Sequence, residues 1–171
     1  DRDIGGGACQ NGQQGGHTLR RMKLAPVLLI LAAVAFAAAA GSWQWIIGRY
    51  APGYSAAQMF MDADPVAKLS MMLAQTLTFG AFLLGVIGLF VRSAAATFRI
   101  LLLLIAAASA GLGVLAALYG WMNIQTAIRN LGGVSFEVAA PSYAETLMAL
   151  SVGLFGALVA LGFHALLARR A

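Results

Sequence analysis

The sequence has few residues of the kinds on which disulfide-linked proteins and metalloenzymes depend. It contains only two His residues and a single cysteine, Cys9. One cysteine excludes an intramolecular disulfide and a CxxC metal site. An HExxH element, a GxSxG element and a phosphate-binding loop are also absent. The sequence therefore predicts no metal site, no bound cofactor and no enzymatic activity.

Charge is equally scarce. Charged residues make up 10% of the 171 residues and hydrophobic residues 61%, with a mean hydropathy of +0.83. A water-soluble domain needs more polar surface than this, so the lipid bilayer is the expected solvent. The net charge of +5 comes from basic residues that occur singly or in pairs at the ends of apolar runs. They form no clustered basic face, so the sequence predicts no nucleic-acid binding.

Four apolar runs are long enough to cross a hydrocarbon core of about 30 Å, which takes roughly 20 helical residues. They cover about residues 24–47, 69–91, 100–122 and 143–167. The sequence thus predicts an all-α fold, an integral membrane bundle of four transmembrane helices within residues 22–171. Residues 1–21 are polar and rich in Gly and Gln, so we expect a disordered tail there. Because Met22 directly precedes the first run, an alternative is that the start is mis-assigned and this tail is not native.

Basic residues are distributed unequally between the two sides of the predicted bundle, and positive charge marks the cytoplasmic side. One side carries Arg20, Arg21, Lys23, Arg92, Arg99, Arg169 and Arg170, and the other carries Arg49, Lys68 and Arg129. Both termini are therefore predicted inside. An alternative for the first run is a signal peptide, because basic residues precede it and the small residues 38–41 resemble a cleavage site.

Small residues recur at four-residue spacing in the last three runs, a pattern that lets transmembrane helices pack closely. We assign this packing role to Ala81, Gly85, Gly113, Ala117, Ala149, Gly153 and Ala157. Three polar residues of the second run, Gln75, Thr76 and Thr78, are expected to form hydrogen bonds between helices, with the lining of a pathway as the alternative. His164 is expected at the inner interface, with a proton relay as the alternative.

One acidic residue, Glu145, lies in or against a predicted span. An ionisable group there is costly, so a function is the default hypothesis. The alternative is structural, because a carboxylate near the start of a helix is favoured by the helix dipole. Asn123, at about the same depth, is placed to donate a hydrogen bond to Glu145, and Thr146 is a possible supporting polar neighbour.

Two motifs surround these residues. Ala140-Pro141-Ser142-Tyr143-Ala144-Glu145-Thr146-Leu147, followed by Gly153-Leu154 and Ala157, resembles the last helix of the MotA/TolQ/ExbB proton-channel family, with its A-P-G-I-A-E-A-L and G-L-x-x-A elements. The stretch from Gly113 to Met122 is similar to the family's G-L-x-G-T-V-W-G-I-M element. The resemblance covers roughly residues 69–168.

The resemblance implies a subunit of the bacterial inner membrane. Five copies would form a homo-oligomer around the helix of a small single-span partner of the ExbD/TolR/MotB kind. Glu145 would then be the family's carboxylate near the pore, able to bind a cation or accept a proton. On this basis we predict an oligomeric proton or cation channel subunit.

The chain departs from the family pattern in two ways. Ala117 and Leu150 stand where the family commonly has pore-facing Thr hydroxyls, so a hydrated relay would be interrupted there. Residues 93–99 replace the large cytoplasmic domain of typical members. These departures leave open an alternative function, a non-conducting structural or accessory membrane protein.

Overall fold

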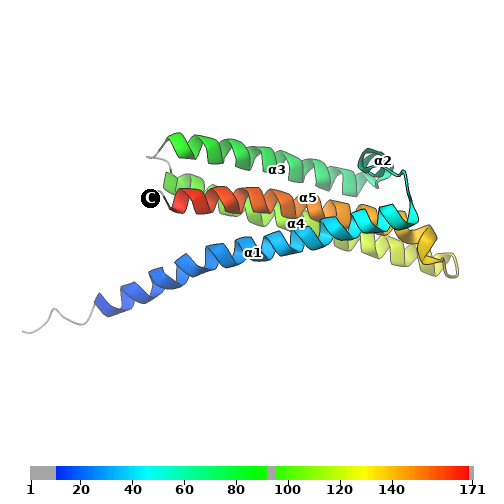
Figure 1. Ribbon diagram of the computed structural model, residues 1–171, viewed down its shortest axis with the longest axis horizontal. Coiled ribbons are helices and arrows are strands. Elements are labelled where there is room, and N and C mark those ends of the chain that lie inside the picture. Colours follow the sequence, from blue (N-terminus) through cyan, green and yellow to red (C-terminus); the bar gives the residue numbers. More distant parts are fainter. Residues whose placement is uncertain (1–10, 92–94, 170–171) are drawn as a thin grey trace, which may run out of the picture.

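The computed structural model describes the backbone of residues 11–91 and 95–169, and side chains from residue 26 onward. It contains five helices, labelled in Figure 1: α1 (Asn11–Tyr50), α2 (Ala56–Asp62), α3 (Pro65–Phe90), α4 (Ala95–Asn130) and α5 (Phe136–Ala168). Four of them, all except α2, are long and apolar enough to cross a membrane. The predicted all-α bundle of four transmembrane helices is therefore confirmed.

The helices extend beyond the predicted spans. α4 continues from residue 122 to Asn130, and α5 begins at Phe136 instead of residue 143. Hydropathy marks only the part that suits hydrocarbon, whereas Gln, Arg and Ala are good helix formers in water as well. The backbone of residues 11–21, where a disordered tail was expected, is likewise helical and continuous with α1. Residues 1–10 of that tail lie outside the described residues.

The predicted loop after α1 contains the short helix α2, which has its own capping box. The Gln58 N–H donates to Ser55 Oγ at 3.2 Å, and the Ser55 N–H donates to Gln58 Oε1 at 2.8 Å. The next helix, α3, begins with Asp64 as its N-cap, whose Oδ1 accepts the Val66 N–H at 2.8 Å, and with Pro65 in the first turn. Side-chain oxygens thus satisfy amides that a helix start leaves unpaired.

The hairpin between α4 and α5 depends on two glycines. Gly132 and Gly133 have φ values of +76° and +104°, a region that strongly favours glycine. The Gly133 N–H donates to the Ile128 carbonyl at 3.1 Å, the six-to-one bond of a Schellman motif. This turn ends α4 within a few residues and lets α5 return antiparallel beside it.

α5 is the central helix of the bundle. It packs along α4, α3 and α1, and α3 also packs on α4. The turn between α1 and α2 and the turn between α4 and α5 lie at one end of the bundle in Figure 1, which we call the loop end. The opposite end, near Phe90, Ala95 and Ala168, is called the C-terminal end. The amino-terminal part of α1 extends past the bundle on that side.

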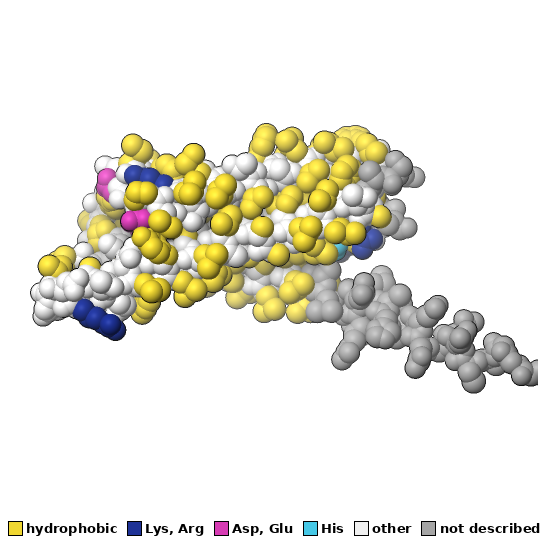
Figure 2. Space-filling view, turned by 180° about the vertical axis from the view of Figure 1, so that it is seen from behind, with side chains coloured by type: hydrophobic (Ala, Val, Ile, Leu, Met, Phe, Trp, Pro, Cys, Tyr) yellow, Lys and Arg dark blue, Asp and Glu magenta, His cyan; other side chains and the backbone are white. Residues whose placement is uncertain are grey.

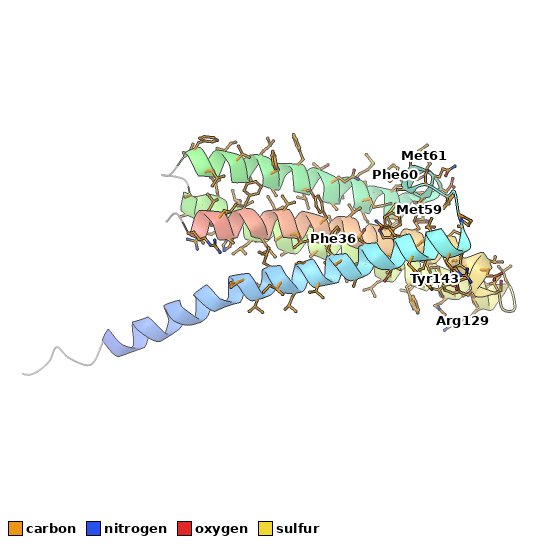
Figure 3. All side chains as sticks on the ribbon, viewed as in Figure 1. Phe36, Met59, Phe60, Met61, Arg129 and Tyr143 are labelled. Carbon is orange, nitrogen blue, oxygen red and sulfur yellow. The ribbon has the colours of Figure 1, made fainter. Side chains whose placement is uncertain are left out.

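Two apolar clusters form the core. The cluster nearer the loop end includes Met59 of α2, which is 1% exposed, packed with Met71 of α3 and Met148 of α5. Figure 3 labels Met59 at this end, together with Tyr143. The second cluster, toward the C-terminal end, includes Leu102 and Leu167. α2 therefore closes the bundle by contributing one buried side chain.

A row of aromatic rings joins α1 to α5 and α4 at the loop end. Tyr50 contacts Phe136 edge to face with ring centroids 5.1 Å apart, and Phe136 stacks on Tyr143 at 5.6 Å. Trp45 and Trp121 extend the row on either side. Aromatic side chains concentrate at membrane interfaces, so this row is consistent with a headgroup boundary at the loop end.

The small residues singled out in the sequence lie at helix contacts. α4 and α5 meet at Gly113 and Gly153, where a Cβ added to Gly153 would lie 2.6 Å from the Gly113 Cα. Gly85 of α3 lies directly under the ring of Phe163. Ala81, Ala149 and Ala157 are buried, whereas Ala117 is only partly buried.

The visible face in Figure 2 is apolar between two charged ends. Basic and acidic side chains gather at the loop end, and basic side chains with a histidine gather at the C-terminal end. The band between them shows hydrophobic and uncharged side chains only, as expected for a face in contact with lipid. The described chain is thus a multi-pass membrane protein.

Candidate functional site

Glu145 lies on the third turn of α5 and faces the start of α3. Its Oε1 accepts a hydrogen bond from the backbone N–H of Asp64 at 3.3 Å, and its side chain is partly buried. Asp64 caps α3, so the carboxylate of one helix accepts the N-cap amide of another, 81 positions away in sequence. The positive end of the α3 dipole is directed at a negative charge there.

A cavity of about 380 Å³ adjoins Glu145 at the loop end. It is lined by residues of the α2–α3 turn, α4 and α5, among them Asp62, Asp64, Asn123 and Thr146. Asp62, Asp64 and the Lys68 ammonium are the charged groups close enough to interact with Glu145. The cavity therefore gathers three carboxylates at the end of the bundle, with the Lys68 ammonium near Glu145.

The predicted partner of Glu145 does not bind it. Asn123 lines the same cavity but forms no hydrogen bond with Glu145, whose Oε1 accepts the Asp64 N–H instead. The Thr146 hydroxyl donates to the Ser142 carbonyl of its own helix at 2.9 Å and packs on Gly120. The structure thus brings all three predicted site residues to one cavity, with Asp64 in the place expected for Asn123.

The hydroxyls in the middle of the bundle are occupied. Thr76 and Thr78 donate to the carbonyls of Met72 and Ala74, one turn earlier in α3, at 2.9 and 2.7 Å. The prediction that these two residues form hydrogen bonds to other helices is therefore wrong. A Thr hydroxyl in a helix lies within reach of the carbonyl one turn earlier in the same helix. Gln75 forms no hydrogen bond within residues 11–91 and 95–169.

A serine that the sequence analysis missed makes the hydrogen bond between helices. Ser109 of α4 is 0% exposed and donates to the Gly153 carbonyl of α5 at 3.0 Å. Ser151, on the adjoining turn of α5, donates to the Met148 carbonyl of its own helix at 2.8 Å. The sequence around Ser109 is rich in alanine and glycine. It does not indicate whether the serine side chain faces another helix or the lipid.

His164 lies near the C-terminal end and is 8% exposed. Its Nδ1 is 3.0 Å from the Arg99 carbonyl oxygen, and because a carbonyl only accepts, Nδ1 is the donor. Glu145 and His164 lie toward opposite ends of α5, some 19 residues or roughly 28 Å apart along the helix axis. Glu145 and His164 are therefore not partners within this chain.

Among the described residues, no group of three or more His, Cys, Asp and Glu side chains is arranged to hold a metal ion. Asp62, Asp64 and Glu145 share a cavity, but all three already accept hydrogen bonds that hold the local fold: Asp62 from the Tyr54 hydroxyl, Asp64 from the Val66 N–H and Glu145 from the Asp64 N–H.

Tyr54 gives the loop end a pH-dependent contact. Its hydroxyl donates to Asp62 Oδ2 at 2.6 Å, and this hydrogen bond, with smaller contributions from desolvation and nearby carboxylates, raises the pKa of Tyr54 to about 12. A raised pKa for an acid means that the contact is complete below the unfolded value of about 10 and is lost as the pH rises toward 12.

We therefore expect Tyr54 to ionise at a higher pH than an ordinary tyrosine. Subtracting the ultraviolet absorbance titration of Tyr54→Phe from that of the unmodified protein should isolate a transition near pH 12. In an Asp62→Asn background the same difference should move down toward about 10. A Tyr54 transition near pH 10 in the unmodified protein would contradict the contact.

No family model, curated protein or solved structure matches the chain.

Proposed function

We propose that the chain is an oligomeric subunit of a bacterial inner membrane, similar to MotA/TolQ/ExbB subunits, that binds a proton or cation at Glu145. Both termini lie in the cytoplasm in this proposal, and a single-span partner completes the path. The observation that carries it is the position of Glu145, partly buried beside a cavity that holds Asp62 and Asp64. Ionisable residues within transmembrane segments are rare and usually have a function.

The interior of one subunit supports an oligomer over a monomeric channel. Beyond the cavity, α4 and α5 touch at Gly113 and Gly153, and the Ser109 hydroxyl at this crossing is used to hold α5. An ion leaving Glu145 therefore has no hydrogen-bonding route between these two helices. Its path would run between subunits or along a partner helix, which is the arrangement that the resemblance implies.

A non-conducting structural or accessory role is the second candidate. The observation that favours it is the set of occupied hydroxyls at Thr76, Thr78 and Ser151, together with the apolar Ala117 and Leu150. In this role Glu145 would serve only to cap the start of α3 through the Asp64 N–H. The two candidates thus assign different purposes to the same contact.

The deciding experiment uses the complex as extracted from its native membrane and reconstituted in liposomes with an internal pH indicator. We expect Glu145→Gln to reduce partner-dependent proton uptake at least tenfold, because the amide cannot carry a proton but still accepts the Asp64 N–H. Glu137→Gln is the matched control, since Glu137 is an exposed carboxylate in the first turn of the same helix. Unchanged uptake in Glu145→Gln would remove the proposed role.

The mass of the purified complex separates the two candidates independently of transport. A pentamer with a co-purifying single-span protein supports the channel subunit. A monomer or dimer without such a partner supports the accessory role.

A further inference from the structure

A groove runs between α1 and α3 over the surface of α5, at the depth of the bilayer. Its volume is about 590 Å³, within the range of about 300–1,000 Å³ typical of small-molecule sites. Its walls include four phenylalanines: Phe36 of α1, Phe79 and Phe82 of α3, and Phe155 of α5. Figure 3 labels Phe36, and its ring lies 5.7 Å from that of Phe155.

The groove is polar toward one end. Trp43 of α1 and Gln75 of α3 line it, and each lies seven residues nearer the loop end than an aromatic residue of the same helix, Phe36 and Phe82 respectively. Because α1 runs toward the loop end and α3 runs away from it, the two polar groups lie at the same end of the groove. The aromatic end lies about 10 Å farther from the loop end.

The Gln75 side chain is exposed and, within the described residues, has no hydrogen-bond partner. It lies ten residues along α3 from Pro65, about 15 Å from the start of the helix. This position is inside a hydrocarbon core of about 30 Å. An unsatisfied amide in hydrocarbon is strongly unfavourable, so the groove calls for an occupant with a hydrogen-bonding group at this depth.

The chemistry of that group follows from the donors present. The Gln75 amide offers two N–H donors and one carbonyl acceptor, and the exposed Gln44 amide of α1 lines the same groove. The N–H donors of these amides call for an occupant that carries acceptors. A carboxylate acceptor would bring an uncompensated charge into the membrane. The ester carbonyls of phospholipids lie at the edge of the hydrocarbon core, and an acyl chain has no acceptor. A neutral carbonyl on a lipid-soluble molecule meets these conditions.

We propose that this groove binds a lipid-soluble quinone. The Gln75 amide donates to a ring carbonyl, the aromatic side chains contact the planar ring, and the apolar tail extends past Phe36 and Phe82 toward the C-terminal end. Aromatic walls favour a flat π system in offset or edge-on contact, which distinguishes a quinone from a saturated lipid carrying a ketone or ester. The site is separate from Glu145 and does not depend on its proposed role.

The test uses the full chain in detergent with Trp45 and Trp121 replaced by Phe, so that Trp43 reports on the groove. The probe is a benzoquinone with a ten-carbon alkyl chain, which quenches tryptophan fluorescence on contact. We expect saturable quenching, weakened at least tenfold by Gln75→Leu and abolished by Val152→Phe, which fills the groove from α5. Thr76→Val is the matched control, since Thr76 is exposed but does not line the groove.

Circular dichroism will check that each variant keeps its helical content. Gln75→Leu and Val152→Phe lie on different helices, so the test remains valid if one of them does not fold. Quenching that rises linearly with probe concentration and is equal in all variants would overturn the proposal. Quenching that becomes saturable only after a co-purifying single-span protein is removed would also overturn it, because a helix would then be the natural occupant.

Discussion

Gly153→Ala is expected to lower the free energy of unfolding by about 3 kcal/mol, at the upper end of the range for overpacked cores. The added Cβ would lie 2.6 Å from both the Gly113 Cα and the Ser109 carbonyl oxygen, and 2.8 Å from the Gly113 nitrogen. All of these are backbone atoms of α4, so no side-chain rotation can relieve the contact. α4 and α5 would have to move apart, which also stretches the hydrogen bond from Ser109 to Gly153.

The measurement is reversible unfolding in mixed detergent micelles, followed by circular dichroism. Gly162→Ala is the matched control, because Gly162 lies on the same helix with nothing within 4 Å of its added Cβ. We expect that control to be neutral or to gain up to about 1 kcal/mol from helix propensity. Gly113→Ala should fall between the two, since its nearest contacts are 3.0 and 3.1 Å. Equal stabilities for the Gly153 and Gly162 variants would contradict the helix crossing.

Gly85→Leu is expected to reverse the sign of the stability change that Phe163→Ala causes. The ring of Phe163 occupies the space that a side chain at Gly85 needs, and it also contacts Phe82 edge to face at 5.7 Å. In the unmodified protein, Phe163→Ala should destabilise by about 3 kcal/mol, because it empties that space. In the Gly85→Leu background the same Phe163→Ala substitution should stabilise the protein, because the new leucine fills the space that the ring leaves.

A double-mutant cycle in the same micelles measures this coupling, which we expect at about 2 kcal/mol or more. Gly80→Leu with and without Phe163→Ala is the control, since Gly80 is on the same helix and its added Cβ meets nothing within 4 Å. Additive effects at Gly85 and Phe163 would show that α3 and α5 do not meet there.

The location of the site could be predicted, but its contacts could not. Glu145 stood out because hydropathy placed a lone carboxylate at the edge of an apolar run. Asp64 and Pro65 carry the recognisable signature of a helix start, yet nothing in their spacing indicates that Glu145, 81 positions later, accepts the Asp64 N–H. The expected Asn123 contact was a matter of depth alone, and depth does not fix the direction in which a side chain points.

Packing shows the same division. The spacing of Gly113 and Gly153 indicated close helix approach, because a missing Cβ has few other uses in a membrane helix. It did not indicate that these two glycines meet one another, or that Ser109 joins them. The sequence also did not distinguish these two glycines from Gly80 and Gly162, where an added Cβ would meet nothing within 4 Å.

The sequence by itself determined that this is a membrane protein with four spanning helices. In hydrocarbon, backbone polar groups must be hydrogen-bonded within the protein, and a long apolar helix meets this condition. Helix pairing, the contacts of Glu145 and the groove beside Gln75 were decided by the tertiary structure. These features depend on which faces of the helices meet, and in a chain apolar on nearly every face hydropathy does not distinguish one face from another.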